Sequence, residues 1–407
     1  MRFIDLFAGA GGFAEGFKRA GFEPVALVEP DSAACFTLKT RLFYHYLKEN
    51  NKLDIYIKYL KGEISRGMLY SAVPSHILES VVNLAIGDEN NSKIFQVIGR
   101  FSGKKDIDMI IGGPSCQAYS LAGRARDRNV MRDDPRNHLY VQYGIFLKKY
   151  RPKLFVFENV PGLLSAEKGK YFKNIQADFK SFGYIVEPFI VNANEFGVLQ
   201  NRKRVIIIGW KKDINFSFDQ LKCQSRVEYK VGNIFNDLPK LSDGKGKDKY
   251  YEYAEGINDY LSFARIRNGL DVLTQHIARP HTEQDKEIYR IAVRKWKRSK
   301  ERLDYNDLPE RLKTHKNRHT FLDRFKVVAD DVPCSQTVVE HIAKDGHYYI
   351  HPDIEQNRSI SVWEAARLQS FPDDYYFEVI KEGQNRTLDY RQIVNAAPPL
   401  IPREFAA

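Results

Sequence analysis

The feature that most constrains the fold is a series of short apolar runs, each of strand length, in the first half of the chain. They occupy residues 2–7, 24–29, 106–111, 153–160, 184–191 and 204–210. Stretches with helical period lie between them, for example Leu139, Tyr143, Phe146, Leu147 and Tyr150. Strands that are apolar throughout are buried on both faces, and helices between them supply the crossovers that parallel strands need. The pattern predicts an α/β fold with a doubly wound, mostly parallel sheet.

The pattern of strand and helix changes after about residue 212, and this change predicts a second, smaller domain. A chain of 407 residues is longer than one hydrophobic core usually organises. Residues 242–249 (SDGKGKDK) read as a loop, and the following stretch to about 357 is basic, aromatic and irregular. We therefore predict a catalytic domain over 1–211, a small domain over 212–358, a hinge over 359–391, and a return to the catalytic domain over 392–407.

Composition favours a reduced, intracellular protein that acts on a polyanion. The four cysteines are too few and too scattered for a disulfide framework, and we find neither a signal peptide nor a membrane-spanning run. We expect a cytoplasmic protein. The net charge of +11 is concentrated in residues 294–326, where twelve Lys and Arg face five Asp and Glu. Such a cluster favours a nucleic-acid partner. The residues His276, His281, Cys334 and His341 lack metal-ligand spacing, so no metal is expected.

A glycine-rich turn follows the first apolar run and predicts a cofactor site. Gly9, Gly11 and Gly12 allow the backbone to approach a ligand closely, and Glu29 follows at the end of the next strand, where it can bind ribose hydroxyls. The turn lacks the spacing that cradles a pyrophosphate. An acidic turn suits a cofactor without phosphate, S-adenosylmethionine, better than NAD. Asp5 is placed to position its ammonium group, and Asp88 to accept from its adenine.

Cys116 stands directly after a Gly-Gly-Pro turn, at the carboxyl end of a predicted buried strand. A free cysteine is most often a small buried hydrophobe. Here, however, the carboxyl ends of parallel strands are where ligands bind. A long polar loop rich in glycine and arginine follows over residues 119–138 and is expected to act as a lid.

Six blocks in this order resemble the cytosine-5 DNA methyltransferases of bacterial restriction-modification type. They are DLFAGAGGF (5–13), GGPSCQAYS (112–120), ENV (158–160), QNRKR (200–204), EAARLQSFPD (364–373) and QIVNAAPP (392–399). The region between about 212 and 325, which they leave out, is where this family carries its variable target-recognition region. The chain departs from the family pattern at Pro30, Ser115, Leu199 and Val394.

The resemblance implies a Rossmann-like methyltransferase fold and the transfer of a methyl group from S-adenosylmethionine to carbon 5 of a flipped-out cytosine. It makes Cys116 the thiolate that adds to carbon 6, a form of covalent catalysis. Glu158 is then the group that protonates or binds ring N3. Arg204 is assigned to the pyrimidine carbonyl and Arg202 to the orientation of Glu158. Asn395 is expected to brace the target nucleotide.

Two sets of binding residues complete these expectations. The cofactor set comprises Asp5, Phe7, Gly9, Ala10, Gly11, Gly12, Glu29, Pro30, Asp88, Glu89, Pro114 and Leu139. The DNA-binding set comprises Gln117, Ser120, Arg124, Arg126, Arg128, Arg294, Lys295, Arg298, Lys316 and Arg318. The expected partner is double-stranded DNA, bound by a monomer, with a cognate restriction endonuclease acting separately and no membrane involved.

Two alternatives remain open on the sequence alone. One is a transfer-RNA cytosine-5 methyltransferase on the same scaffold. The other is a catalytically silent DNA-binding relative, although the presence of Cys116, Glu158 and Arg204 together argues against it.

Overall fold

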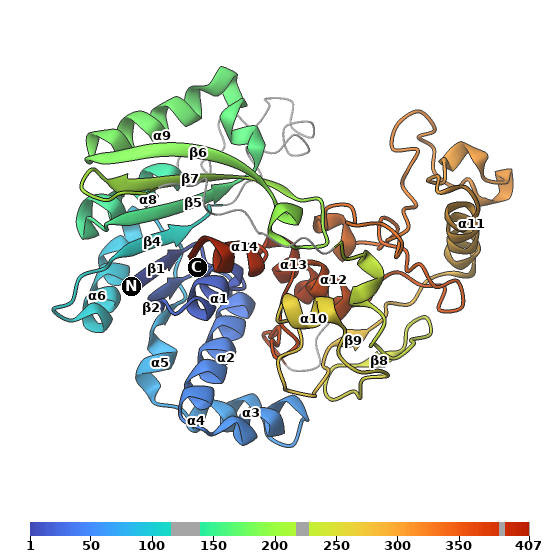
Figure 1. Ribbon diagram of the computed structural model, residues 1–407, viewed down its shortest axis with the longest axis horizontal. Helices are drawn as coiled ribbons and strands as arrows, with labels where there is room; N and C mark the ends of the chain where they lie inside the picture. The colour runs from blue at the N-terminus through green and yellow to red at the C-terminus, as the bar shows by residue number, and fades with distance from the viewer. Residues whose placement is uncertain (115–138, 217–227, 382–386, 407) are drawn as a thin grey trace.

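A computed structural model of the chain describes residues 1–114, 139–216, 228–381 and 387–406, and a seven-stranded sheet forms its centre (Figure 1). The strands are β1 (Arg2–Leu6), β2 (Glu23–Val28), β3 (Val81–Val82), β4 (Met109–Gly112), β5 (Leu154–Asn159), β6 (Tyr184–Asn192) and β7 (Lys203–Lys211). Their order is β3-β2-β1-β4-β5-β7-β6. The first five strands pair in parallel, and β7 runs antiparallel to both β5 and β6. The predicted mostly parallel sheet is confirmed.

Helices cover both faces of the sheet because successive strand residues point to opposite sides. On β1, Phe3 packs into one hydrophobic cluster and Ile4 into the other. The first cluster includes α1 (Gly12–Arg19) and α14 (Leu400–Ala406). The second lies beneath α6 (Asp88–Ser102), α8 (Leu139–Tyr150) and α9 (Lys170–Ser181). This double cover explains why the strands are apolar throughout.

A helical extension follows β2 and has a hydrophobic cluster of its own. It consists of α2 (Ser32–Glu49), α3 (Leu53–Leu60), α4 (Arg66–Ser71) and α5 (Ser75–Glu79), and it projects at the bottom of Figure 1. Its cluster also takes in Leu270, Val272 and Tyr376 from much later in the chain. The extension therefore joins the sheet domain to the second half of the molecule.

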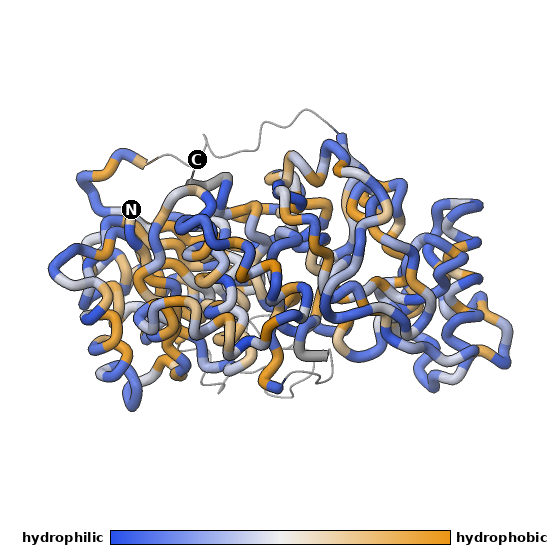
Figure 2. Tube along the Cα trace, turned by 90° about the horizontal axis from the view of Figure 1, so that it is seen from below, coloured by the Kyte–Doolittle hydropathy of each residue, from blue (hydrophilic) through white to orange (hydrophobic). Residues whose placement is uncertain are grey.

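The second half contains little regular structure apart from one long helix, α11 (Glu283–Ser299). Thr282 starts this helix with a capping box, in which its hydroxyl accepts from the Asp285 amide at 3.1 Å and the Asp285 carboxylate accepts from the Thr282 amide at 3.1 Å. The remaining elements are short: β8 (Gly246–Lys247), β9 (His276–Ile277), α10 (Asp259–Phe263) and the 3-10 turns η5 (Val231–Ile234), η6 (Tyr305–Asp307), η7 (Glu310–Leu312) and η8 (Glu340–Ala343). Hydrophilic residues predominate at the end of the molecule that carries α11 (Figure 2).

Residues 358–379 are almost entirely buried, and ion pairs tie them to both halves of the molecule. The Arg367 guanidinium, on α12 (Val362–Leu368), binds Asp373 at 2.9 Å and Asp237 at 3.0 Å. From α2, Arg41 donates to Asp374 at 2.8 Å. This segment thus forms the joint between the halves; its role as a hinge, like the domain boundaries, remains a prediction.

The end of the chain returns to the sheet domain through α13 (Thr387–Asn395) and α14. Close packing requires two glycines of α1: a Cβ on Gly12 would lie 2.0 Å from the Ala397 carbonyl, and one on Gly16 would lie 2.4 Å from the Pro399 carbonyl. Three further 3-10 turns, η2 (Pro161–Leu164), η3 (Ala166–Gly169) and η4 (Ala193–Phe196), lie in the sheet domain. Among the helices described, none combines the length and apolar character needed to span a bilayer.

Candidate active site

The glycine-rich turn between β1 and α1 is closely packed on one side and open on the other. Phe7, Gly9 and Gly11 have positive φ angles of 61°, 54° and 83°. A Cβ on Gly11 would lie 2.6 Å from the Leu38 side chain, whereas one on Gly9 would meet nothing within 4 Å. The open space beside Gly9 suits the close approach of a ligand. On the packed side, the Tyr375 hydroxyl donates to the Ala10 carbonyl and holds the turn in place.

Asp5, on β1, is a buried carboxylate that lacks a well-formed hydrogen bond within the described part of the chain. Burial, followed by the nearby charge of Glu29, raises its pKa to about 8, although the Ala14 amide partly offsets the rise. A buried carboxylate in this state is stabilised by a cationic donor. The residues present therefore fit the ammonium group of S-adenosylmethionine.

Glu29 follows β2 and ties the glycine turn to the neighbouring strand. One carboxylate oxygen accepts from the Gly9 amide at 2.8 Å and the other from the Asp31 amide at 2.9 Å. Burial raises the pKa of this carboxyl. The contact of Glu29 with ribose hydroxyls stays a prediction, and its hydrogen bond to Gly9 places it beside the open side of the turn.

The remaining expected cofactor residues lie on neighbouring elements of the same sheet. Asp88 and Glu89 are exposed in the first turn of α6, where the Asp88 carboxylate accepts from Gln142 of α8 at 3.0 Å. Pro30 is exposed after β2, Leu139 opens α8, and Pro114 is buried two residues after β4. Their contact with the cofactor stays a prediction.

Glu158 and Arg204 form an ion pair between two adjacent strands. Glu158 lies near the end of β5 and Arg204 near the start of the antiparallel β7, and the Arg204 Nε lies 2.7 Å from Glu158 Oε1. Both side chains are partly exposed, at 19% for Glu158 and 14% for Arg204. The pair can therefore meet a ligand from solvent.

The chain before Cys116 passes directly over this ion pair. A Cβ on Gly113 would lie 2.6 Å from the Glu158 carbonyl and 2.7 Å from its Oε2. Asn159 donates from its side-chain nitrogen to the Pro114 carbonyl at 3.2 Å. Sequence reasoning did not assign a role to Gly113, although the second glycine of the Gly-Gly-Pro turn was the visible signal. Cys116 itself lies outside the described residues.

The expected role of Arg202 is wrong. Its guanidinium donates to the carbonyls of Val338 at 3.0 Å and Val394 at 2.9 Å, and it is Arg204 that holds Glu158. The prediction assumed that Arg202 and Arg204 lie two residues apart on one strand, so that both side chains point to the same side. Since β7 begins at Lys203, Arg202 lies in the preceding turn, where the strand pleat does not set its direction. Arg202 therefore joins the start of β7 to α13. Asn395 is exposed at the end of that helix.

Comparison with protein families settles which chemistry this geometry belongs to. The family model of the C-5 cytosine-specific DNA methylase matches residues 1–74 and 79–407. The chain belongs to this family. It is a DNA cytosine-5 methyltransferase, and the family implies S-adenosylmethionine as the methyl donor.

Individual relatives agree with this assignment. The methyltransferase is 41% identical to the type II methyltransferase M.Bpa9945I of Bacillus paralicheniformis, over 98% of this chain and 96% of the relative. It is 32% identical to the type II methyltransferase M.DdeI of Desulfomicrobium norvegicum, over 100% of this chain and 88% of the relative. Its fold matches a solved putative DNA modification methyltransferase encoded within an E. coli prophage, with a TM-score of 0.66 at 21% identity, covering 100% of this chain and 97% of that one.

The expected DNA-binding residues of the methyltransferase fall into three groups. Gln117, Ser120, Arg124, Arg126 and Arg128 lie outside the described residues. Lys295 and Arg318 are engaged within the protein, by Asp307 at 2.7 Å and Glu310 at 2.9 Å. Arg294, Arg298 and Lys316 are exposed. The third group is the best placed to bind phosphates.

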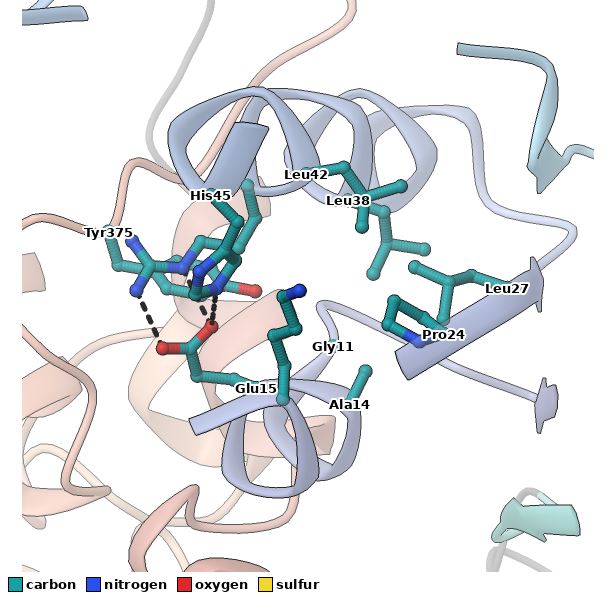
Figure 3. A pocket seen from close by; sticks show the side chains of 11 residues that line it. Gly11, Ala14, Glu15, Pro24, Leu27, Leu38, Leu42, His45 and Tyr375 are labelled. Atoms are coloured by element: carbon teal, nitrogen blue, oxygen red, sulfur yellow. Dashed lines mark hydrogen bonds and ion pairs between the residues drawn. The ribbon is translucent and has the colours of Figure 1, made fainter. Parts of the chain in front are cut away.

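A small pocket lies behind the glycine turn, between α1, α2 and β2 (Figure 3). Its polar wall is an ion-pair network in which Glu15 accepts from Arg41 at 2.6 Å and contacts His45 at 2.9 Å. Although burial alone would raise the pKa of Glu15, the charges of Arg41 and His45 lower it. Because these charges satisfy one another, the network braces the turn from behind. In the described part of the methyltransferase, no three His, Cys, Asp or Glu residues are grouped to hold a metal.

Proposed function

We propose that this methyltransferase modifies carbon 5 of one cytosine within a specific duplex DNA sequence, through a temporary bond between the Cys116 sulfur and carbon 6. The observation that carries the proposal is the Glu158–Arg204 ion pair, 2.7 Å long and partly exposed, directly beneath Gly113. Cys116 follows Gly113 by three residues, and in this proposal a base that meets the ion pair also meets the thiol.

The first step is addition of the Cys116 thiolate to carbon 6, which forms the C–S bond and breaks the C5=C6 double bond. The displaced electron pair moves into the ring, and Glu158 delivers a proton to N3 as this charge develops. Arg204 keeps one Glu158 oxygen at 2.7 Å and thereby orients the other toward the base. Carbon 5 becomes an enamine carbon and can attack an electrophilic methyl group. Once carbon 5 carries the methyl group, N3 returns its proton to Glu158, and loss of the carbon 5 proton to a base expels the sulfur as thiolate and restores the double bond.

Bound S-adenosylmethionine supplies that methyl group from its sulfonium centre. The residues that would hold the cofactor are Asp5, which binds the ammonium, Glu29, which binds the ribose, and the open side of the turn at Gly9. Asp88, at the start of α6, would accept from the adenine amino group. The cytosine itself must leave the duplex, since carbon 5 and carbon 6 are otherwise stacked between neighbouring bases.

The names of the curated relatives support a place in a type II restriction-modification system. We propose that the methyltransferase acts as a monomer on cytoplasmic DNA and protects it from a separate endonuclease of the same specificity. The surplus of Lys and Arg in residues 294–326 supports a DNA-binding role for the small domain.

Methyl transfer and covalent trapping test this proposal together. Purified protein is incubated with tritiated S-adenosylmethionine and either unmethylated genomic DNA or bulk transfer RNA, and bisulfite sequencing then identifies the modified cytosine in the DNA. Duplexes carrying 5-fluorocytosine at that position should form an adduct that survives denaturation, because fluorine cannot leave as a proton does. Cys116→Ser should form no adduct and transfer no methyl, while still binding the cofactor. Transfer to RNA alone, or turnover by Cys116→Ser, would overturn the proposal.

A further inference from the structure

Phe321 combines two unfavourable features that a folding role does not explain. Its side chain is 69% exposed, the largest fraction among the exposed large apolar residues of the described chain. Its backbone is also left-handed, with φ of 56°, a conformation that side-chain-bearing residues rarely adopt. Glycine or asparagine at this position would relieve the strain and remove the exposed ring.

The loop around Phe321 is held firmly by its own side chains. The Asn317 side-chain oxygen accepts from the amides of His319 and Thr320, each at 3.0 Å. Arg324 donates to the carbonyls of Phe321 at 3.0 Å and Asn317 at 2.9 Å. Five residues thus share a hydrogen-bonded loop whose shape does not depend on the phenyl ring.

Two residues that follow Phe321 are anchored to the rest of the protein. Leu322 packs against the hydrophobic cluster beneath α11, and its carbonyl accepts from the Tyr305 amide at 2.7 Å. Arg324 lies over the Tyr305 ring, 4.1 Å from its centre. With both of these neighbours anchored inward, the Phe321 ring is directed into solvent.

The surroundings of the ring favour nucleic acid over protein as its partner. Residues 313–326 contain five Lys and Arg and one Asp, and Lys316 and His319 are exposed near the ring. A protein interface normally needs a contiguous apolar patch, whereas Phe321 stands among polar residues. A single apolar ring flanked by cations fits a duplex, where the cations meet phosphates and the ring enters between bases.

We propose that Phe321 is a specificity-determining residue that inserts its ring at a base step of the bound DNA. This inference rests on the proposed function only in that the substrate is duplex DNA. The strain at Phe321 is retained because it aims the ring outward before binding. The base step that opens to receive the ring contributes to sequence selection, since steps differ in how easily they unstack.

The test compares Phe321→Gly, Phe321→Ala and Phe321→Tyr with a matched control, Met68→Ala. Met68 is 57% exposed on α4, away from the basic loop. The probes are a duplex containing the site found by bisulfite sequencing and a scrambled duplex of the same composition. A second set of duplexes carries 2-aminopurine at single positions at least three base pairs from the target cytosine.

The glycine and alanine variants should bind the site duplex roughly 5- to 100-fold more weakly, the range expected for loss of one stacked ring. They should also lose a 2-aminopurine fluorescence increase that the wild type shows at one step. Phe321→Tyr should retain both properties, and Phe321→Gly should melt at the wild-type temperature or above. Met68→Ala should match the wild type throughout.

Three outcomes would overturn the inference. The first is wild-type affinity and discrimination in both small variants, with methyl transfer intact, which would leave the proposed function standing. The second is a marked fall in melting temperature for Phe321→Gly, which would make the ring structural. The third is unchanged DNA binding with lost self-association in sedimentation, which would assign the ring to a protein contact. A wild type that methylates no duplex at all would refute the proposed function and this inference together.

Discussion

Gly113 packs directly against Glu158, the carboxylate that we propose is catalytic. Its backbone lies outside the left-handed region, so alanine would not be strained there. The limit is space, because an added Cβ would lie 2.7 Å from Glu158 Oε2 and 2.6 Å from the Glu158 carbonyl. Glycine at this position is therefore required by Glu158, not by the turn.

Gly113→Ala should lower kcat by about 100-fold, since a displacement of roughly 1 Å at a reacting group has an effect of that size. Cofactor affinity should change little, because Asp5 and Glu29 lie on other strands. Methyl transfer and equilibrium cofactor binding, measured well below the melting temperature, check both expectations.

Gly99→Ala provides the matched control for this substitution. Gly99 is exposed on α6, and a Cβ there would meet nothing within 4 Å. The Gly99→Ala variant should be more stable by about 0.5–1 kcal/mol, because alanine favours the helix more than glycine does, and it should keep full activity. Equal activity in the two variants would contradict the role given to Gly113.

At the scale of elements, the sheet was predictable because its strands are buried on both faces. Six expected runs correspond to β1, β2, β4, β5, β6 and β7, and most of their ends agree with the strand ends to within one or two residues. Strand β3 escaped detection because it has only two residues, Val81 and Val82, too few to show a period. The helix α11 was also missed, although Ile288, Tyr289, Ala292 and Val293 repeat at helical spacing within its basic sequence.

For the candidate site, the sequence could predict that Asp5, Glu29 and Glu158 lie at or near the ends of buried strands, while their roles stay predictions. The site was not predictable where long-range packing decides. The roles of Arg202 and Arg204 depend on where β7 begins, and only tertiary contacts show that Arg202 binds carbonyls 136 and 192 residues away. Tyr375 supports the glycine turn from 365 residues away, a contact that no local pattern indicates.

The element that joins the two halves, α12 with its flanking residues, depends on a buried arginine. Arg367 is fully buried and binds Asp237 and Asp373. Arg367→Leu should destabilise the protein by about 3–5 kcal/mol, because Asp373 would be left buried without a counter-charge and Asp237 would keep only Arg267, at 3.3 Å. Thermal or urea unfolding measures the loss.

A second substitution separates the charge effect from simple loss of packing. Adding Asp373→Asn to Arg367→Leu should restore part of the lost stability, since the uncompensated charge of Asp373 is then removed, while Asp237 keeps its ion pair with Arg267. Arg311→Leu is the control: Arg311 is 65% exposed and pairs with Glu287 at the surface, so its loss should change stability by less than about 1 kcal/mol. A further loss of stability in the double variant would contradict this account.

For the whole molecule, buried histidines set the response of stability to acid. Burial lowers the pKa of His276 and His281 to about 4 and that of His351 to about 3, from an ordinary value of 6.5. The unfolded chain therefore binds more protons below pH 6.5, and the stability that these residues contribute is lost as the pH falls toward 4. Asp5 acts in the opposite sense: its pKa is raised to about 8, so its contribution is lost as the pH rises toward that value.

Because six of the described histidines have a lowered pKa and four of the described carboxyls a raised one, the melting temperature should fall as the pH is lowered from 6.5 to 4.5. Carboxylates with lowered pKa, such as Glu15 and Glu364, lose their contribution only below that window. His276→Gln should flatten the profile if the amide keeps the contacts to Ser361 and the Pro239 carbonyl. A profile that rises toward acid would refute the assignment.

The charge of the whole molecule, +11, predicts how DNA binding responds to salt. Each phosphate neutralised should add roughly 0.9 to the slope of log affinity against log salt concentration.

On α11, Arg290, Arg294 and Arg298 are exposed at four-residue intervals. They lie on the side opposite the buried residues of the helix, which spaces them along one face. The double variant Arg294→Ala/Arg298→Ala should therefore reduce the slope by nearly the contribution of two phosphates. Lys295→Ala should reduce it much less, because Asp307 already engages that ammonium group at 2.7 Å. Equilibrium binding to a duplex, measured between about 50 and 300 mM salt, tests both expected changes in slope. Equal slopes in the double variant and the wild type would show that α11 does not contact the phosphate backbone.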